Sequence, residues 1–262
     1  MSGSSGSDRA LRSAVEAARA AGDVLTRGFA SSDKEARAKG HPNNPVTVYD
    51  HRAEQAIVRI LTAEHPDDGI LSEESDETHG TSGRRWIVDP LDGTSNFLAG
   101  IPQFAVSIAL AVGDEVVLGC VHDPVREETF TAVRSSGAYL NQRSIHVSQR
   151  RTLDGAVLGI GLSFHPERRA VMLDQTRRLV DRASVLRTLG SAALDFAYVA
   201  AARFDAMWYV ALHPWDVAAG GLLVEEAGGR TSDLQGAPMQ DPRFGVAASN
   251  NWIHDPFLHA LA

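Results

Sequence analysis

The chain has little cysteine, no excess of positive charge and no long apolar run, and each shortage excludes a class of protein. Its single cysteine, Cys120, cannot form an internal disulfide, and its apolar neighbours indicate a buried structural thiol. No stretch approaches the roughly 18 consecutive apolar residues of a membrane span. The net charge of −8, with no basic patch, argues against sequence-independent binding of nucleic acid or anionic membranes. We therefore expect a soluble, cytoplasmic protein with no nucleic-acid or membrane partner.

The remaining composition predicts a globular protein of 262 residues, 44% of them hydrophobic, between one large domain and two closely packed ones. Residues 1–7 lack the apolar core of a signal peptide and are predicted to be a flexible leader. Residues 8–150 predict an α+β half with a large antiparallel sheet, and residues 151–262 predict an α/β half of alternating strands and helices. Because no linker-like composition separates the halves, we expect them to pack as one unit.

The expected elements follow from periodicity and from turn residues. Helices are predicted at 8–29, after Asp50, at 167–182, 191–202 and 216–227, and at the C-terminal end of the sequence. Two β-rich runs at 104–112 and 115–121 flank Gly113-Asp114, which predicts a hairpin. The other predicted strands cover residues 69–72, 86–88, 129–133, 145–147, 156–160, 185–188, 205–210 and 245–249.

Acidic residues stand where three of these elements begin or end. Glu73-Glu74 follows one strand, Asp89 and Asp92 follow the next, and Asp216 opens a helix of small residues. Strand ends and helix starts are where α/β proteins place their ligand-binding groups. Carboxylates that converge repel one another unless a cation neutralises them, and hard oxygen ligands suit Mg²⁺ or Mn²⁺. The pattern therefore predicts a metal site.

The segment D-P-L-D-G-T joins these acids to a second kind of chemistry. Pro90 restricts the backbone, so that a sharp turn can point Asp89, the Leu91 carbonyl and Asp92 at one volume. Gly93-Thr94 then supplies backbone N–H groups at a helix start, where an anion would bind. Metal ligands and phosphate donors would thus lie side by side.

Each acidic feature also has a simpler structural explanation. Asp89 and Asp92 would cap an ordinary turn, since Asp, Pro and Gly are common turn residues. Glu73-Glu74 would be a solvated surface pair, and Asp50 and Asp216 would be helix N-caps. Taken singly, none of these features decides between a structural and a functional role.

Taken together, the motifs resemble those of the inositol monophosphatase family, which belongs to the lithium-sensitive, Mg²⁺-dependent phosphatase superfamily that includes the fructose-1,6-bisphosphatases. The residues concerned are D-P-L-D-G-T-S-N-F at 89–97, S-E-E-S at 72–75 and W-D-V-A-A-G at 215–220. The resemblance implies an α/β (α+β) fold arranged as a layered αβαβα sandwich, and a homodimer. It also implies Mg²⁺-dependent hydrolysis of a small phosphate monoester, with two or three ions per site and Mn²⁺ as a possible substitute.

The same resemblance implies roles for individual residues. The implied metal ligands are Glu73, Asp89, the Leu91 carbonyl, Asp92 and Asp216. Thr94, hydrogen-bonded toward Asp50, would activate the attacking water together with Glu73, and Asp92 would belong to this catalytic group. The Gly93 and Thr94 amides would hold phosphate oxygens. Glu74 would contact the metal ligands without binding the metal itself.

Further residues are implied on the substrate side. Lys39 would lie on a loop that closes over the site. The segment 187–193 would line the substrate through Arg187, Gly190, Ser191 and Ala192.

One position departs from the family pattern. Tyr209 stands where members that bind inositol carry a glutamate, although its hydroxyl could still contact substrate. Inositol monophosphate, histidinol phosphate, a sugar bisphosphate and 3′-phosphoadenosine 5′-phosphate therefore all stay open as substrates. His213 is explained either as a substrate contact or as loop surface.

Two rival interpretations are weaker. A haloacid-dehalogenase-type phosphatase also has a D-G-T motif, but its two aspartates are separated by one residue and lie near the N-terminus. A non-catalytic binding protein on the phosphatase fold would have lost at least one site residue. All five candidates, Glu73, Asp89, Asp92, Thr94 and Asp216, are present.

Overall fold

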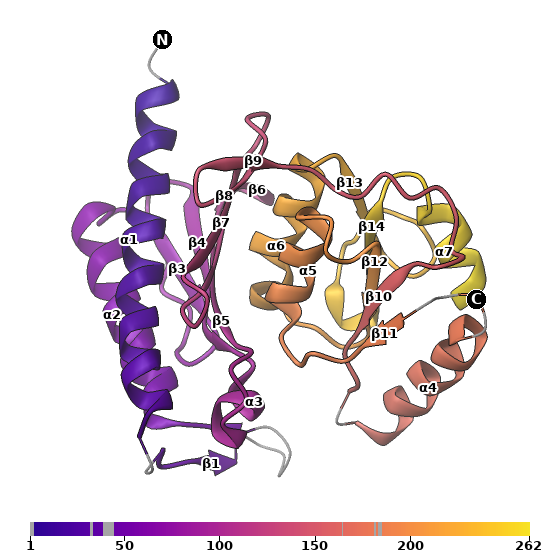
Figure 1. The fold of residues 1–262 in the computed structure, drawn as a ribbon. Coiled ribbons are helices and arrows are strands. Elements are labelled where there is room, and N and C mark those ends of the chain that lie inside the picture. The colour runs from indigo at the N-terminus through magenta and orange to yellow at the C-terminus, as the bar shows by residue number, and fades with distance from the viewer. Residues whose placement is uncertain (1–2, 32–33, 39–44, 164, 181, 183–184) are drawn as a thin grey trace.

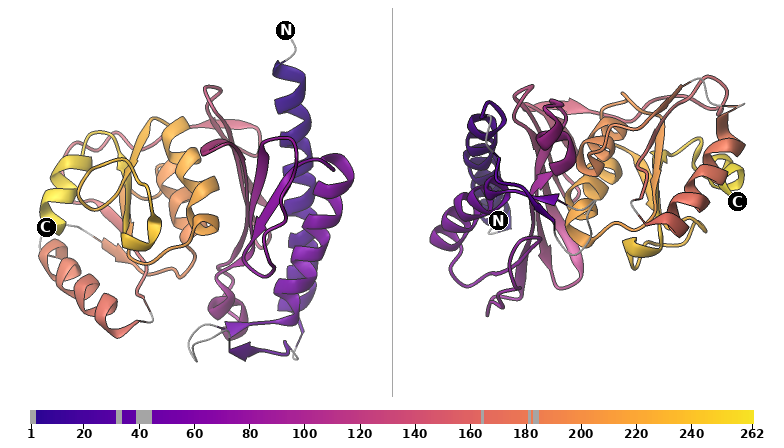
Figure 2. Two further views of the ribbon diagram at one scale, coloured as in Figure 1. Left: turned by 180° about the vertical axis from the view of Figure 1, so that it is seen from behind. Right: turned by 90° about the horizontal axis from the view of Figure 1, so that it is seen from below.

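Five layers, helices alternating with sheets, make up the protein in the computed structural model (Figure 1). The structure describes residues 3–31, 34–38, 45–163, 165–180, 182 and 185–262. In order, the layers are a helix pair, a seven-stranded sheet, a second helix pair, a five-stranded sheet and an outer helix pair, as the views from behind and below also show (Figure 2). The expected αβαβα sandwich is therefore confirmed.

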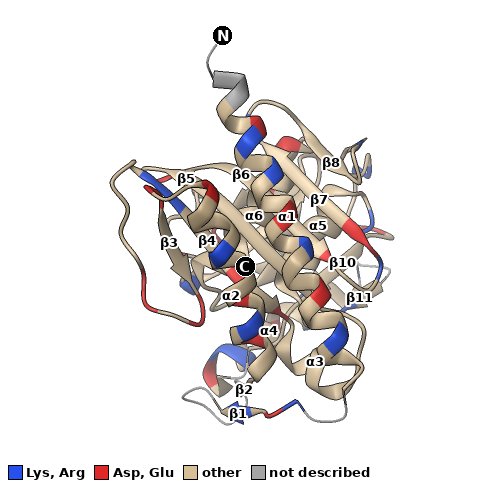
Figure 3. Cartoon of the chain, turned by 90° about the vertical axis from the view of Figure 1, so that its left-hand side faces the viewer, with Lys and Arg blue, Asp and Glu red and all other residues tan. Residues whose placement is uncertain are grey.

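The first layer is formed by α1 (Gly3–Phe29) and α2 (Val48–Glu64). α1 begins at Gly3, so residues 3–7, which were predicted to belong to a flexible leader, form its first turns. Its buried face consists almost wholly of alanine, which lets the helix lie close to the sheet: Ala10, Ala14, Ala17, Ala18, Ala21 and Leu25. Acidic and basic residues are interspersed along this helix (Figure 3).

α2 begins one turn earlier than the sequence indicated. Thr47 is the N-cap, and its side chain accepts from the Tyr49 and Asp50 amides. Asp50 is the third helical residue and accepts from the Thr47 amide at 2.8 Å, which completes a capping box. The prediction of Asp50 as N-cap is therefore wrong, because the threonine three residues earlier has that role.

The seven-stranded sheet follows chain order, and β3 pairs with β4 in parallel while all later pairs are antiparallel. The predicted hairpin is present, with Gly113 at φ +59° in its turn. Cys120 is buried in this sheet, as expected. The strands are β3 (Gly69–Ser72), β4 (Arg84–Asp92), β5 (Ala105–Val112), β6 (Glu115–Asp123), β7 (Glu128–Val133), β8 (Ala138–Leu140) and β9 (Arg143–Ile145). A separate short hairpin pairs β1 (Arg37–Ala38) with β2 (Pro45–Val46).

The middle helices α5 (Ala192–Ala200) and α6 (Pro214–Glu226) pack between the two sheets. Every residue of α5 is buried. α6 approaches the seven-stranded sheet so closely that a Cβ on Gly119 would lie 2.6 Å from the Ala219 carbonyl oxygen. One apolar cluster runs from β5 and β7 through these helices to β12 (Ala206–Tyr209) and β14 (Val246–Asn250), so the two halves share a core.

The five-stranded sheet has the order β11-β10-β12-β14-β13, and β14 runs antiparallel to both of its neighbours. The predicted alternation of strands and helices is present. β13 was not predicted, because its four residues are polar or glycine and show no alternation of apolar and polar residues. The elements are β10 (Val157–Ile160), α4 (Pro166–Val180), β11 (Val185–Arg187), β12 (Ala206–Tyr209), β13 (Gly229–Ser232), the 3₁₀ turn η1 (Pro242–Phe244), β14 (Val246–Asn250) and α7 (His254–Leu261).

Polar contacts also tie the halves together. Glu226 at the end of α6 accepts from the amides of Ser135, Ser136 and Gly137 in the turn after β7. Both terminal guanidinium nitrogens of Arg203 donate to the Glu128 carboxylate.

Among the described residues, no helix is both long and apolar enough to cross a membrane.

Candidate active site

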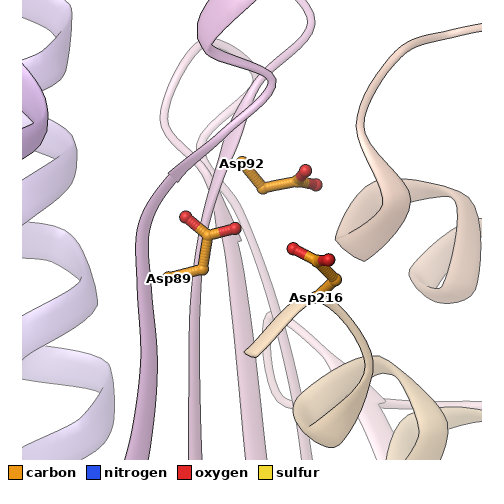
Figure 4. A group of neighbouring side chains, drawn as sticks. All are labelled: Asp89, Asp92 and Asp216. Atoms are coloured by element: carbon orange, nitrogen blue, oxygen red, sulfur yellow. The ribbon is translucent and has the colours of Figure 1, made fainter. Parts of the chain in front are cut away.

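Three carboxylates from the two halves converge at one point (Figure 4). Asp89 and Asp92 come from the end of β4, and Asp216 comes from the first turn of α6. Each of the three offers a carboxylate oxygen within 4.8 Å of the others. The sequence predicted all three as metal ligands.

The end of β4 explains how Asp89 and Asp92 reach the same side. Asp89 pairs with Ser107 of β5, and Asp92 pairs with Ala105. Between these two pairs the chain advances by three residues on β4 and by two on β5, so β4 has one extra residue. In a regular strand, residues three apart point to opposite faces, and the extra residue of a bulge reverses that. The predicted turn at D-P-L-D is therefore a bulge within a strand.

Backbone and hydroxyl donors fix the orientation of all three carboxylates. Asp89 Oδ1 accepts from the Leu91 amide at 2.9 Å, and Asp216 Oδ2 accepts from the His213 amide at 2.6 Å. Asp92 Oδ2 accepts from the Ser191 hydroxyl at 2.5 Å and from the Ala193 amide at 2.8 Å. The side chains are thus held in place by the chain itself before any ligand binds.

The start of α6 differs from the predicted one. The helix begins at Pro214 with His213 as N-cap, and Asp216 is its third residue. The predicted helix start at Asp216 is therefore wrong, although the prediction that it lies in the site is compatible with this position. The Ser107 hydroxyl donates to the Trp215 carbonyl at 3.2 Å and so ties this helix start to β5.

Burial and the repulsion between neighbouring carboxylates disfavour the ionised forms in this cluster. Burial, followed by the charges of Glu73, Asp92 and Asp216, raises the pKa of Asp89 well above its usual value. Burial also raises the pKa of Asp92, although the hydrogen bonds from Ser191 and the α5 amides lower it in part. Hard oxygen donors in a cluster of mutually repelling carboxylates fit a divalent cation such as Mg²⁺ or Mn²⁺.

The two glutamates after β3 lie beside different parts of the site. The Glu73 amide donates to the Val88 carbonyl at 3.2 Å, which places Glu73 next to Asp89 on the neighbouring parallel strand. The Glu74 charge instead raises the pKa of Asp50. The simpler explanation, a solvated surface pair, is therefore wrong, since both glutamates are half-buried against the acidic centre.

Thr94 and Asp50 form the predicted pair. The Thr94 hydroxyl lies 3.1 Å from both Asp50 Oδ1 and the Leu91 carbonyl oxygen, either of which can accept its proton. Burial raises the pKa of Asp50 to about 6, against the lowering effect of its hydrogen bonds with Thr47, while the Glu74 charge raises it further. Asp50 thus holds Thr94 from the α2 side.

A close contact between backbone segments brings residues 189–193 to this centre. Gly93 has φ +95°, and a Cβ there would lie 2.9 Å from the Gln103 carbonyl oxygen and 3.3 Å from that of Gly190. The Asn96 side chain in α3 (Thr94–Ala99) donates to the Gln103 and Leu189 carbonyls at 2.8 and 2.7 Å. This bridging role of Asn96 was not predicted, because it depends on a partner 93 residues away.

The remaining predicted substrate residues divide into three groups. Gly190, Ser191 and Ala192 lie beside the acidic centre, where Ser191 also caps α5. Arg187 is exposed and donates to the neighbouring Leu186 carbonyl, so the structure does not bring it to the centre. Lys39 lies outside the described residues.

The Tyr209 hydroxyl is already engaged within the protein. It donates to Asp195 Oδ2 at 2.7 Å, and both side chains are buried. The predicted contact between this hydroxyl and substrate is therefore not supported. Asp195 was missed, although a single carboxylate within the apolar run A-A-L-D-F-A-Y-V-A was a signal that could have found it.

Comparisons with known proteins agree with this arrangement. The chain matches the Inositol monophosphatase family over residues 7–262. It is 42% identical over 246 residues to "Nus factor SuhB" of Pseudomonas aeruginosa, covering 92% of this chain and 91% of that protein. It is 42% identical over 251 residues to "Inositol-1-monophosphatase" of Mesorhizobium japonicum, covering 94% of each. The crystal structure of the extragenic suppressor protein suhB of Bartonella henselae superposes with a TM-score of 0.93 at 40% identity, covering 96% of this chain and 98% of that one.

The acidic centre, the layered fold and these matches along nearly the whole length lead to one assignment: the chain belongs to the inositol monophosphatase family.

Proposed function

We propose that the protein hydrolyses the phosphate ester of a small alcohol to the alcohol and inorganic phosphate, with Mg²⁺ as cofactor. The observation that carries this proposal is the convergence of Asp89, Asp92 and Asp216, contributed by both halves, within 4.8 Å. Membership of a phosphatase family and the presence of Thr94 with its Asp50 partner support it.

The donor set indicates how metal would be held. Asp89, Asp92 and Asp216 would bind it together with Glu73 and the Leu91 carbonyl, and Mn²⁺ could replace Mg²⁺. When bound, two or three such ions would neutralise phosphate charge and make a coordinated water more acidic. We expect lithium to inhibit the enzyme, as the family resemblance implies.

The chain's own residues would position the nucleophile and the phosphate. When the Thr94 hydroxyl donates to Asp50, its oxygen is left to accept a hydrogen bond from a water, so the pair can orient that water. Glu73, next to Asp89, is the carboxylate that would accept the one proton that the water loses as it attacks. The Gly93 and Thr94 amides in the first turn of α3 would donate to phosphate oxygens. No covalent phosphoenzyme is required.

A panel of phosphate esters tests the proposal. We expect Mg²⁺-dependent phosphate release from at least one of inositol 1-phosphate, histidinol phosphate, fructose 1,6-bisphosphate and 3′-phosphoadenosine 5′-phosphate. Asp92→Asn should lower kcat/KM by roughly a thousandfold without unfolding the chain, because it removes a charged ligand. No turnover on any ester, together with no binding of Mg²⁺, would contradict the proposal.

A second candidate is a binding role without catalysis. The observation that favours it is that several relatives, at 41% to 43% identity, bear the name of a Nus factor, which names no reaction. Retention of Glu73, Asp89, Asp92, Thr94 and Asp216 argues for the enzyme. Wild-type turnover that disappears in Asp92→Asn would favour catalysis; a folded chain without turnover would favour binding.

We also expect the protein to form a homodimer, as the family resemblance implies.

A further inference from the structure

The side chain of Asn96 joins three backbone segments beside the candidate active site. Asn96 is the third residue of α3, and its side-chain nitrogen lies 2.8 Å from the Gln103 carbonyl oxygen and 2.7 Å from the Leu189 carbonyl oxygen. Carbonyl oxygens only accept, so this atom is the NH₂ nitrogen and both of its N–H groups are used. The start of α3, the approach to β5 and the loop before α5 thus meet at one side chain.

This contact crosses between the two halves of the chain. Leu189 lies 93 residues after Asn96, in the loop between β11 and α5. In the part of the chain that the structure describes, no other side chain of α3 hydrogen-bonds to residues 188–190. Gly190 has φ +77°, and a Cβ there would lie 2.9 Å from Asn96 Nδ2, so a side chain at this position would push the loop away from the amide.

The loop that Asn96 holds delivers two of the donors that orient Asp92. Ser191, two residues after Leu189, is fully buried, and its hydroxyl donates to Asp92 Oδ2 at 2.5 Å. The Ala193 amide donates to the same oxygen at 2.8 Å. Groups that orient a metal ligand raise metal affinity, because the ligand loses less freedom when the ion binds. A shift of this loop would therefore weaken the binding of a cation by Asp92.

We propose that Asn96 is a positioning residue for the metal site: it holds the start of α5 against Asp92 and so sets the affinity of the acidic centre for a divalent cation. The inference rests on the proposed function, since it assumes that the centre binds a metal. Among the residues described, no hydrogen bond joins Asn96 to the three carboxylates, so its effect passes through residues 189–193. A residue of the N-terminal half thus controls how the C-terminal half completes the site.

Direct binding of Mn²⁺ tests the proposal without turnover. Electron paramagnetic resonance of free Mn²⁺ gives the dissociation constant, and circular dichroism confirms folding. We expect Asn96→Ala to raise the dissociation constant about tenfold, as for loss of a group that supports metal ligands. Asn96→Leu keeps the size of the side chain but removes both donors, so it should have the same effect. A dissociation constant within about twofold of wild type in either folded variant would overturn the inference.

Asn141→Ala is the matched control. The Asn141 side chain also bridges two backbone groups, because it donates to the Glu127 carbonyl at 3.0 Å and accepts from the Thr129 amide at 2.9 Å. These partners lie in β7 and the turn before it, and none is a candidate site residue. Whatever stability this variant loses, its dissociation constant for Mn²⁺ should stay within about twofold of wild type. An equal loss of affinity in Asn141→Ala would mean that any destabilisation weakens the site, and the inference would fail.

A double variant shows whether the effect passes through the start of α5. In a Ser191→Ala background, Asn96→Ala should raise the dissociation constant for Mn²⁺ by less than about threefold, because the group that it positions is already gone. A full tenfold effect in both backgrounds would refute this route. Should the Asn96 variants fail to fold, Gly190→Ala introduces a Cβ against the Asn96 amide and should raise the dissociation constant about tenfold. An unchanged value in folded Gly190→Ala would then overturn the inference.

The outcomes distinguish this inference from the function on which it rests. If wild type binds no Mn²⁺ and releases no phosphate from any ester of the panel, the proposed function fails. If wild type binds Mn²⁺ and the Asn96 variants bind it equally well, the function stands and only the positioning role fails. Activity gives a second measurement: Asn96→Ala should need about tenfold more Mg²⁺ for half-maximal activity, while kcat at saturating Mg²⁺ stays within about threefold of wild type.

Discussion

The acidic centre of the candidate site and the buried Asp195–Tyr209 pair next to it are built in different ways. At the acidic centre, Asp89 and Asp92 lie three residues apart on one bulged strand, and nearby amides fix their carboxylates. In the buried pair, Tyr209 and Asp195 meet from a strand and a helix, and a Cβ on Gly161 would collide with the Tyr209 ring. The acidic centre is therefore specified mainly by residues that are close in the chain, whereas the buried pair depends on contacts between separate elements.

The largest effect expected within this comparison concerns Thr94. Thr94→Val removes the hydroxyl that Asp50 holds, and we expect kcat to fall about 10² to 10³-fold, as for loss of a positioned proton-transfer group. Thr94→Ser, which keeps the hydroxyl, should retain most of the activity. Steady-state phosphate release with saturating Mg²⁺ measures both variants. Near wild-type kcat in Thr94→Val would show that the Thr94 hydroxyl does not take part in the proposed reaction.

A smaller effect is expected at Ser191, where α5 meets the acidic centre. Ser191 donates to Asp92 and caps α5, so Ser191→Ala should raise the Mg²⁺ concentration for half-maximal activity about 10 to 100-fold. Loss of the cap should also lower the free energy of unfolding by about 1 kcal/mol. Activity titrated with Mg²⁺ and urea denaturation give the two values, with Ser191→Thr as the control that keeps the hydroxyl. A loss of stability alone would show that Ser191 supports the helix and not the metal site.

The smallest effect is one on stability, and it should arise in the C-terminal half, away from the acidic centre. The ring of buried His254 lies between two serine hydroxyls, with Nε2 at 2.9 Å from Ser232 Oγ and Nδ1 at 2.7 Å from Ser249 Oγ. Burial, together with the Arg230 charge, lowers its pKa from 6.5 to about 4. The unfolded chain therefore binds a proton near pH 6.5 that the folded chain refuses, so stability is full above that pH and falls as the pH drops toward 4.

We expect this histidine to account for roughly 1 to 2 kcal/mol of lost unfolding free energy between pH 7.5 and 4.5, after allowance for solvent screening. Denaturant unfolding at several pH values measures it, with His254→Gln as a reference that does not titrate. The slopes of the two proteins should differ in this range. Parallel slopes would mean that His254 does not resist protonation in the folded chain.

The same division explains what the sequence could predict. Asp89, Asp92 and the Gly93-Thr94 pair are close in the chain, so a local motif sufficed to predict that they lie together, and the other acidic motifs were needed to predict a site. Asp195 was missed because its partner lies 14 residues away in another element, and only the three-dimensional structure brings the two together. The Tyr209 hydroxyl was assigned to substrate for the same reason.

Local errors had local physical causes. Asp50 was predicted as an N-cap and Asp216 as the start of its helix, yet each is the third residue of its helix and accepts from the backbone of the true cap. Acidic residues are typical of the N-cap and of the third helical position alike, so composition alone does not separate them. The layered fold was predictable because most of its strands and helices have clear periodicity, whereas the polar β13 has none.

The central claim is that both halves of the chain complete one metal site. It is tested most directly by counting Mn²⁺ ions bound to wild type and to Asp216→Asn by electron paramagnetic resonance, with circular dichroism to confirm folding. The account predicts about one ion fewer per chain in the variant at Mn²⁺ concentrations that saturate wild type. Equal stoichiometry and equal affinity in a folded variant would contradict it.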